Sequence, residues 1–81
     1  MKTEKDEPLV QSRVTGKYYK LSQVVAILNI QQIIAYLRNG VELLHIYASN
    51  DINTGKPVLV ALFDRDKSRW AYDLWCKHEL K

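Results

Sequence analysis

The feature that most constrains the fold is a short amphipathic segment, residues 29–40 (NIQQIIAYLRNG), that carries its own helix start and stop signals. Asn29 can accept hydrogen bonds from the first free backbone amides, with Gln32 placed to reach back to it. Gly40 can adopt the left-handed conformation that ends a helix. The apolar residues recur at i, i+3, i+4 and i+7 and are Ile30, Ile33, Ile34 and Leu37. The segment therefore predicts a helix with one apolar face toward a core.

The length of the chain sets the number of domains and limits the core. Eighty-one residues predict one domain, and a chain of this size buries only about 60–65% of its unfolded surface, so its stability is marginal. Residues 1–14 mix both charge signs around Pro8 and predict a flexible charged tail. A single α+β domain is expected over residues 15–81. Pairing with a second copy would add buried surface.

Composition narrows the class of protein and its compartment. No apolar run approaches the roughly 18–20 residues that span a bilayer, and the charged start of the chain lacks the apolar region of a secretory signal. A single cysteine, Cys76, excludes an internal disulfide and fits a reducing compartment. The formal charge of +3 is too small an excess to indicate nucleic acid by itself. We expect a soluble, cytoplasmic protein with no membrane partner.

The stretch before the capped helix fits either a strand or a helix. Residues 17–28 (KYYKLSQVVAIL) hold paired tyrosines and several β-branched residues, which favours a strand. The alternative is one unbroken helix from Ser22 to Asn39. We favour the strand because residues 24–28 are apolar on all sides and because the capping pattern at Asn29 marks a new helix start.

Two further strands and a helix follow the capped segment. Residues 41–49 alternate loosely between apolar and polar, and the turn-rich residues 50–56 come next. Pro57 then opens residues 58–63, which are apolar on both faces and fit the centre of a sheet. Asp64 is expected to cap the final helix. The apolar residues on adjoining turns of that helix are Trp70, Ala71, Leu74 and Trp75.

These elements predict the order strand, helix, strand, strand, helix (βαββα). The simplest arrangement is a three-stranded antiparallel sheet with the third strand central and both helices on one face, resembling half of a ferredoxin-like fold. Such a sheet leaves two exposed edges and one face bare of helices, and both features favour pairing with another chain. The aromatic candidates for the bare face are Tyr18, Tyr19, Tyr47 and Phe63.

Three stretches carry a resemblance to a known family. They are NIQQIIAYLRNGVELLHIY, GKPVLVALFDRDKS and YDLW, and together they cover about two thirds of the chain, roughly residues 28–76. They resemble a family of short proteins of unknown function encoded by bacteriophages and Gram-positive bacteria. The shared motifs are structural, and the charged N-terminus has no counterpart in the family pattern. The resemblance implies an accessory factor that binds host or phage proteins.

Few residues form a pattern that could carry chemistry. Cys76 and His78 are spaced as a metal or nucleophile–base pair, with His45 as a remote third ligand. On a helix, however, residues i and i+2 point about 200° apart, so the pair cannot share an ion. Asp64 and Asp66 could hold a divalent cation, but a helix cap and a first-turn acid explain them more simply. We expect no metal, no cofactor and no enzymatic activity.

Basic residues gather near the last predicted helix and the first predicted strand. The candidate contacts to nucleic acid or phosphate are Lys20, Arg65, Lys67, Arg69 and Lys77. Nearby aromatic residues could stack on bases. We favour a solvated face of mixed sign because acidic residues interrupt the same helix. These acids are Asp64, Asp66, Asp73 and Glu79.

Surplus aromatic residues indicate an interface. Trp70 and Trp75 lie about 140° apart around a helix, so one can pack on the sheet while the other lies nearer the flank. Tyr72 is expected to be exposed, since it points away from the apolar face. The expected interface residues are Tyr18, Tyr19, Tyr47, Trp70 and Tyr72.

The sequence therefore predicts a non-enzymatic protein-interaction module that forms a homodimer or small oligomer and occupies the surface of an unidentified partner protein. Two alternatives stay open. One is a nucleic-acid-binding regulator that uses the basic last helix. The other is a small-nucleotide sponge at a subunit interface.

Overall fold

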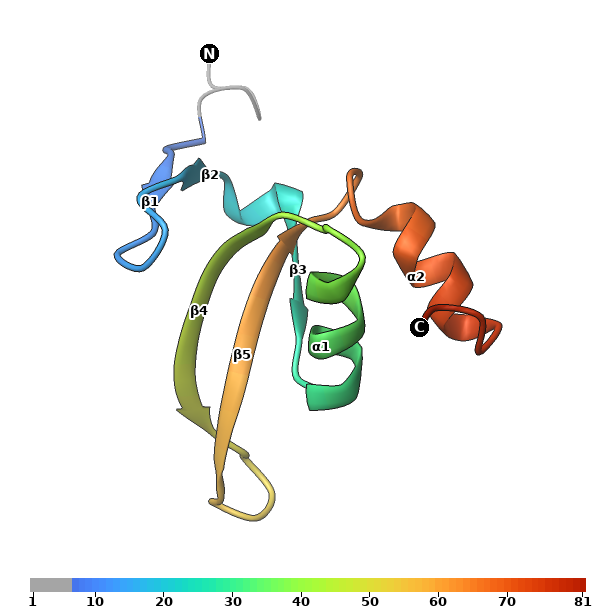
Figure 1. Cartoon of the computed structure of the whole chain (residues 1–81). Helices are drawn as coiled ribbons and strands as arrows, with labels where there is room; N and C mark the ends of the chain where they lie inside the picture. Colours follow the sequence, from blue (N-terminus) through green and yellow to red (C-terminus); the bar gives the residue numbers. More distant parts are fainter. Residues whose placement is uncertain (1–6) are drawn as a thin grey trace.

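The computed structural model describes residues 7–81, which form a small α+β domain with two helices, a two-stranded sheet and a three-stranded sheet, both antiparallel (Figure 1). The elements in chain order are β1 (Val10–Gln11), β2 (Tyr18–Tyr19), a short 3-10 turn η2 (Leu21–Gln23), β3 (Val24–Ile27), α1 (Ile30–Arg38), β4 (Leu43–Asn50), β5 (Pro57–Asp64) and α2 (Arg69–Cys76).

The three-stranded sheet has the order β3-β5-β4, so the apolar run at residues 58–63 occupies the centre, as predicted. β4 and β5 form a long hairpin, which Figure 1 shows extending past the helices. An irregularity between Leu43 and His45 shifts the register near the start of β4. Both β3 and β4 are edge strands, and β3 is much the shorter.

The prediction of one strand over residues 17–28 is wrong. The chain turns through η2 at Leu21–Gln23, so β2 pairs with β1 in a separate sheet and only β3 joins β5. The folded part of the chain also begins earlier than expected, because β1 and the buried Ser12 lie within the range assigned to a tail. Residues 1–6 of that predicted tail lie outside the described residues.

The start and stop signals of α1 are confirmed. The Asn29 Oδ1 accepts hydrogen bonds from the amides of Gln31 (2.9 Å) and Gln32 (3.2 Å), and Gly40 has a φ of 79°. The expected return contact from Gln32 is wrong, because its Nε2 donates to the hydroxyl of buried Tyr36 (3.1 Å). A buried phenol needs a hydrogen-bond partner, and Gln32 lies one turn away to supply it.

The predicted apolar face of α1 is rotated from the real one. Ile33 is 2% exposed, but Ile34 is 42% exposed, and Ile30 and Leu37 are exposed as well. The residues that α1 buries are Gln32, Ile33, Ala35 and Tyr36. Tyr36 decides the rotation, because its large ring packs edge-on against Phe63 with centroids 5.0 Å apart. An exposed aliphatic stripe is left on the outside of the helix.

The core lies on both faces of the central strand. Ala61 and Phe63 pack with Ile33 and Tyr36 of α1 and with Ala71 of α2, so both helices contribute to one cluster. The expectation that Phe63 lies on the bare face is wrong, since it is fully buried under the helices. The other face carries a second cluster beneath the β1–β2 hairpin, formed by Tyr19, Val24, Leu44, Val60 and Leu62.

Asp64 does not cap α2, contrary to the prediction. Its Oδ1 accepts hydrogen bonds from the amides of Asp66 and Lys67, both at 3.0 Å, and so closes the turn that follows β5. Ser68 holds the same turn, since its Oγ donates to the Asp64 carbonyl (2.7 Å). The helix begins only at Arg69. Asp64 and Asp66 therefore belong to a connection that fixes where α2 starts.

Candidate functional site

The outer edge of β3 presents backbone groups that no other strand of the described chain pairs with. The Arg65 amide donates to the Gln23 carbonyl (2.7 Å), which makes that position a hydrogen-bonded pair of the β3–β5 ladder. Because such pairs alternate along antiparallel strands, Val24 and Ala26 direct their amides and carbonyls away from β5. Ala26 is exposed. The edge is therefore open at Ala26.

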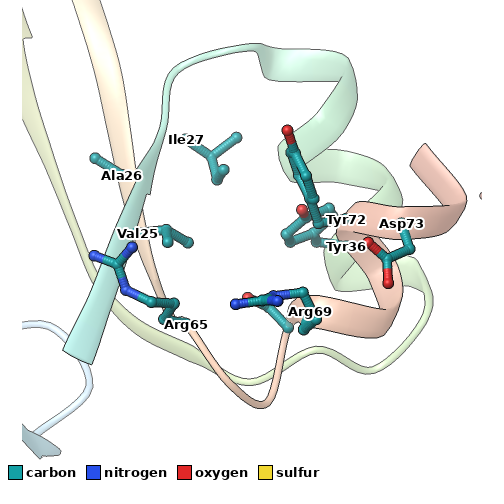
Figure 2. A pocket seen from close by; sticks show the side chains of 9 residues that line it. Val25, Ala26, Ile27, Tyr36, Arg65, Arg69, Tyr72 and Asp73 are labelled. Carbon is teal, nitrogen blue, oxygen red and sulfur yellow. The ribbon is translucent and has the colours of Figure 1, made fainter. Parts of the chain in front are cut away.

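A groove of about 420 Å³ lies beside this edge, between β3 and α2 (Figure 2). Val25 and Ile27 are half-buried and form an apolar wall, since alternate residues of a strand share one face. Tyr36 reaches the groove from α1, and Tyr72 faces it from α2. The groove therefore offers apolar surface next to a free strand edge.

Two arginines lie at the Val24 end of the groove. The Arg65 Nη2 donates to the Val24 carbonyl (3.1 Å), and Figure 2 shows the Arg69 guanidinium extending into the groove toward Val25. Asp73 also lines the groove on the α2 side, but within residues 7–81 neither arginine forms an ion pair. This end of the groove carries positive charge that the described part of the chain leaves without a direct counterion.

The two tyrosines of the groove are neutral at physiological pH. Burial raises the pKa of Tyr36, although the hydrogen bond from Gln32 opposes that shift. Contact with Cys76, by a hydrogen bond and then by charge, raises the pKa of Tyr72. Neither phenol therefore adds negative charge to the groove.

A second, more polar cleft of about 310 Å³ lies under the β1–β2 hairpin. Its cations are Lys17 and Lys67, and its acids are Glu42 and Asp64. Lys17 and Glu42 form an ion pair. Because acids and bases alternate here, the second cleft has no surplus charge of one sign to attract a ligand.

The ion pair in the second cleft predicts a pH dependence. A hydrogen bond from Lys17, and then its charge, hold the pKa of Glu42 below the ordinary value of 4.5. A lowered folded-state pKa contributes stability above the unfolded pKa and loses it as pH falls through the folded pKa. We expect the melting temperature of Glu42→Gln to lie slightly below that of the wild type at pH 7, and the gap between them to narrow as the pH falls below 4.5.

Thermal melts at pH 7 and pH 3, with Glu79→Gln as an exposed control, test this prediction. An unchanged gap between Glu42→Gln and the wild type from pH 7 to pH 3 would contradict it. The effect should also weaken in high salt, because the pair is solvent-exposed.

The predicted interface residues do not form one surface. Tyr72 and Trp70 are exposed on α2, but only Tyr72 lines the groove. Tyr18 is exposed on the hairpin, and Tyr47 is exposed on β4. Tyr19 is buried, and its ring stacks on His45 with centroids 6.1 Å apart. Tyr19 therefore acts in packing the hairpin onto the sheet, where it cannot contact a partner.

The five basic residues predicted to contact nucleic acid or phosphate also lie on different parts of the surface. Arg65 and Arg69 both line the groove, whereas Lys67 lines the second cleft. Lys20 is half-buried at the start of η2, and Lys77 is exposed at the end of α2. The fold brings together one pair of the five candidates.

The cysteine and histidines are placed differently from the prediction. α2 ends at Cys76, and His78 lies beyond it with a φ of 60°, so the two residues do not share a helix. The His45 Nδ1 lies 2.8 Å from the Ser12 Oγ, and its ring stacks with the rings of Tyr19 and Tyr47. Residues 7–81 contain no group of three side chains arranged to hold a metal ion.

Sequence reasoning missed the apolar wall of the groove and the role of Ala26. The alternation in VVAI fits an edge strand with Val25 and Ile27 on one face, but the same residues also fit a central strand. The structure distinguishes an edge strand from a central one, because in the described part of the chain β3 pairs with β5 and with no other strand. The sequence therefore contains the alternation of VVAI, but only the tertiary structure shows that this strand lies at the edge of the sheet.

The fold and groove define a small α+β domain with an open strand edge. Comparisons with protein-family models, with curated proteins and with solved structures find no match for this chain. The resemblance to short phage-encoded proteins therefore stays a prediction. Among the described residues, neither helix has the length and apolar character needed to cross a bilayer.

Proposed function

We propose that this chain is a non-enzymatic protein-interaction module that binds an extended segment of a partner protein along β3. The observation that carries the proposal is the open edge at Ala26 beside a groove of about 420 Å³. A peptide added to a sheet edge gains affinity from backbone hydrogen bonds and specificity from side-chain pockets, and both are available here.

The geometry of strand addition fits the groove. Successive side chains of an added strand point to opposite faces, so every second one would lie on the side of Val25 and Ile27. That side is the groove, with Tyr72 opposite the wall. A short ligand segment would therefore place one or two apolar side chains between β3 and α2.

Proline at Ala26 should weaken this binding and leave the fold intact. The Ala26 amide points away from β5, so Ala26→Pro removes a donor to the ligand and no hydrogen bond of the sheet. We expect peptides selected from a displayed random library on the wild-type chain to bind Ala26→Pro at least about 10-fold more weakly, since the donor and the close approach are both lost. Fluorescence anisotropy with labelled peptides measures the change.

Ala48→Pro on β4 is the matched control. The Asp51 amide donates to the Lys56 carbonyl (2.8 Å), so the alternation directs the Ala48 amide outward from the opposite edge. This variant makes the same substitution at an equivalent edge position and should retain the peptide. Equal binding by Ala26→Pro and the wild type would contradict strand addition at β3.

Self-association is a further part of the proposal. β4 forms the other edge with eight residues, and Tyr47 and Ala48 are exposed along it. A long exposed edge is a natural site for pairing with a second copy. Sedimentation at high micromolar concentration should show a dimer, and Ala48→Pro should shift it toward monomer. A monomeric wild-type chain at that concentration would contradict the proposed self-association.

The remaining features of the proposal rest on the sequence. They are a cytoplasmic location, an accessory role of the phage type and the relation of the βαββα part to half of a ferredoxin-like fold. The alternative functions have their own tests. A nucleic-acid regulator should shift DNA or RNA in low salt, and a nucleotide sponge should be stabilised against heat by a nucleotide.

A further inference from the structure

We propose that the segment bound along β3 is the free C-terminus of a partner protein, with its terminal carboxylate held by Arg65 and Arg69. The inference rests on the proposed function and names the ligand of the same groove. Three features carry it: the position of the two arginines, the way the strand edge ends, and the direction in which β3 runs.

The two arginines are held together by the β5–α2 connection. Arg65 follows the last residue of β5, and Arg69 opens α2. Asp64 fixes the turn between them, since its carbonyl accepts from the Ser68 amide (3.0 Å) and its Oδ1 accepts from the Asp66 and Lys67 amides (3.0 Å each). The connection therefore presents both guanidinium groups at one end of the groove without further ordering of the backbone.

The strand edge is closed at that same end. The Arg65 Nη2 already donates to the outward carbonyl of Val24, so the next ladder hydrogen bond of an added strand would have to share that acceptor with a charged donor. At the other end the edge runs out toward exposed Leu28 and Asn29. A peptide that ends beside Val24 fits this arrangement, whereas an internal segment would have to continue past the arginines.

The direction of β3 sets the direction of the ligand. β3 runs from Val24 to Ile27, so a ligand that ends at Val24 and extends toward Ile27 runs antiparallel to it. In that arrangement one ligand residue exchanges both hydrogen bonds with Ala26. About two residues then separate Ala26 from the arginines, since a strand advances about 3.4 Å per residue.

The chemistry at the closed end favours a carboxylate. Guanidinium groups bind carboxylates through paired hydrogen bonds, and these charge-assisted bonds are among the stronger ones in proteins. Tyr36 and Tyr72 are neutral, so they do not repel an anion. The apolar wall of Val25 and Ile27 accommodates the side chain that accompanies the carboxylate.

A pair of synthetic peptides separates this inference from the broader one. Random peptides displayed with free C-termini are selected on the wild-type chain, and each selected sequence is then made as the free acid and as the C-terminal amide. We expect amidation to weaken binding about 10- to 100-fold, and Arg65→Gln or Arg69→Gln to weaken the acid by a similar factor. Lys67→Gln, a basic control outside the groove, should bind like the wild type.

A coupling measurement strengthens the test. If Arg69 holds the terminal carboxylate, the amide should bind Arg69→Gln and the wild type equally, because the interaction is already lost. Circular dichroism of each variant checks that the fold is kept, as expected for two exposed arginines.

The outcomes distinguish the two proposals. Equal binding of acid and amide, with affinity still lost in Ala26→Pro, would overturn capture of a C-terminus and keep strand addition. A dependence on internal acidic residues of the peptide would likewise overturn C-terminal capture alone. Binding unaffected by Ala26→Pro would overturn both proposals. So would the selection of no peptide together with ADP binding that Arg65→Gln and Arg69→Gln abolish, which would assign the arginines to phosphate.

Discussion

Phe63→Ala is expected to remove a large part of the free energy of unfolding of the domain and to lower the urea midpoint accordingly. Phe63 is 0% exposed in the central strand and packs edge-on against Tyr36, so truncation leaves a cavity beneath both helices. Such a change costs about 3–5 kcal/mol. The total free energy of unfolding of a chain of this length is roughly 4–12 kcal/mol. Urea denaturation followed by circular dichroism measures the loss.

Leu59→Ala is the control for this prediction. Leu59 lies on the same strand and points to the same side of the sheet as Phe63, but it is 39% exposed because the hairpin extends past the helices there. We expect a cost of about 1 kcal/mol or less. Similar losses for Leu59→Ala and Phe63→Ala would contradict the position of the core.

Ile33→Ala and Ile34→Ala should differ strongly although the residues are neighbours. Ile33 is 2% exposed in the main cluster, so its truncation should cost about 2–5 kcal/mol. Ile34 is 42% exposed on the outer face of α1 and should cost about 1 kcal/mol or less. Both variants replace isoleucine by alanine in the same helix, so the change in helix propensity is the same. The difference between their free energies of unfolding therefore reports burial alone. Equal free energies of unfolding would show that the helix is rotated toward the face predicted from the sequence.

The rotation of α1 shows where sequence reasoning succeeds and where it stops. The ends of the helix are local features, set by Asn29 and Gly40, and the sequence predicts them correctly. The buried face depends on partners elsewhere in the chain. Tyr36 packs against Phe63, and the volume of two packed rings outweighs the aliphatic periodicity of Ile30, Ile34 and Leu37. Periodicity identifies a helix more reliably than its orientation.

The split of residues 17–28 has a related cause. Tyr19 belongs to the second cluster, where it packs under the hairpin and stacks on His45, and this contact lies far along the chain. The turn η2 separates it from β3. No residue in the stretch is a strong turn signal, so composition alone predicts one strand. Long-range packing decided the element boundary.

The groove is also a product of tertiary structure. The sequence predicts Tyr72, Arg65 and Arg69 as candidates but assigns them to separate hypotheses. The turn closed by Asp64 places the arginines beside Val24, and that contact defines the end of the strand edge. The residue types are visible in the sequence, and their juxtaposition is not.

The most direct measurement of strand addition is amide hydrogen exchange at Ala26, followed by NMR in the free and peptide-bound chain. The outward amide should exchange freely without ligand and slow at least about 10-fold when a selected peptide saturates the groove, because it then donates to the peptide backbone. The Ala48 amide on the opposite edge should not respond to the peptide. Unchanged exchange at Ala26 in the saturated complex would contradict strand addition at β3.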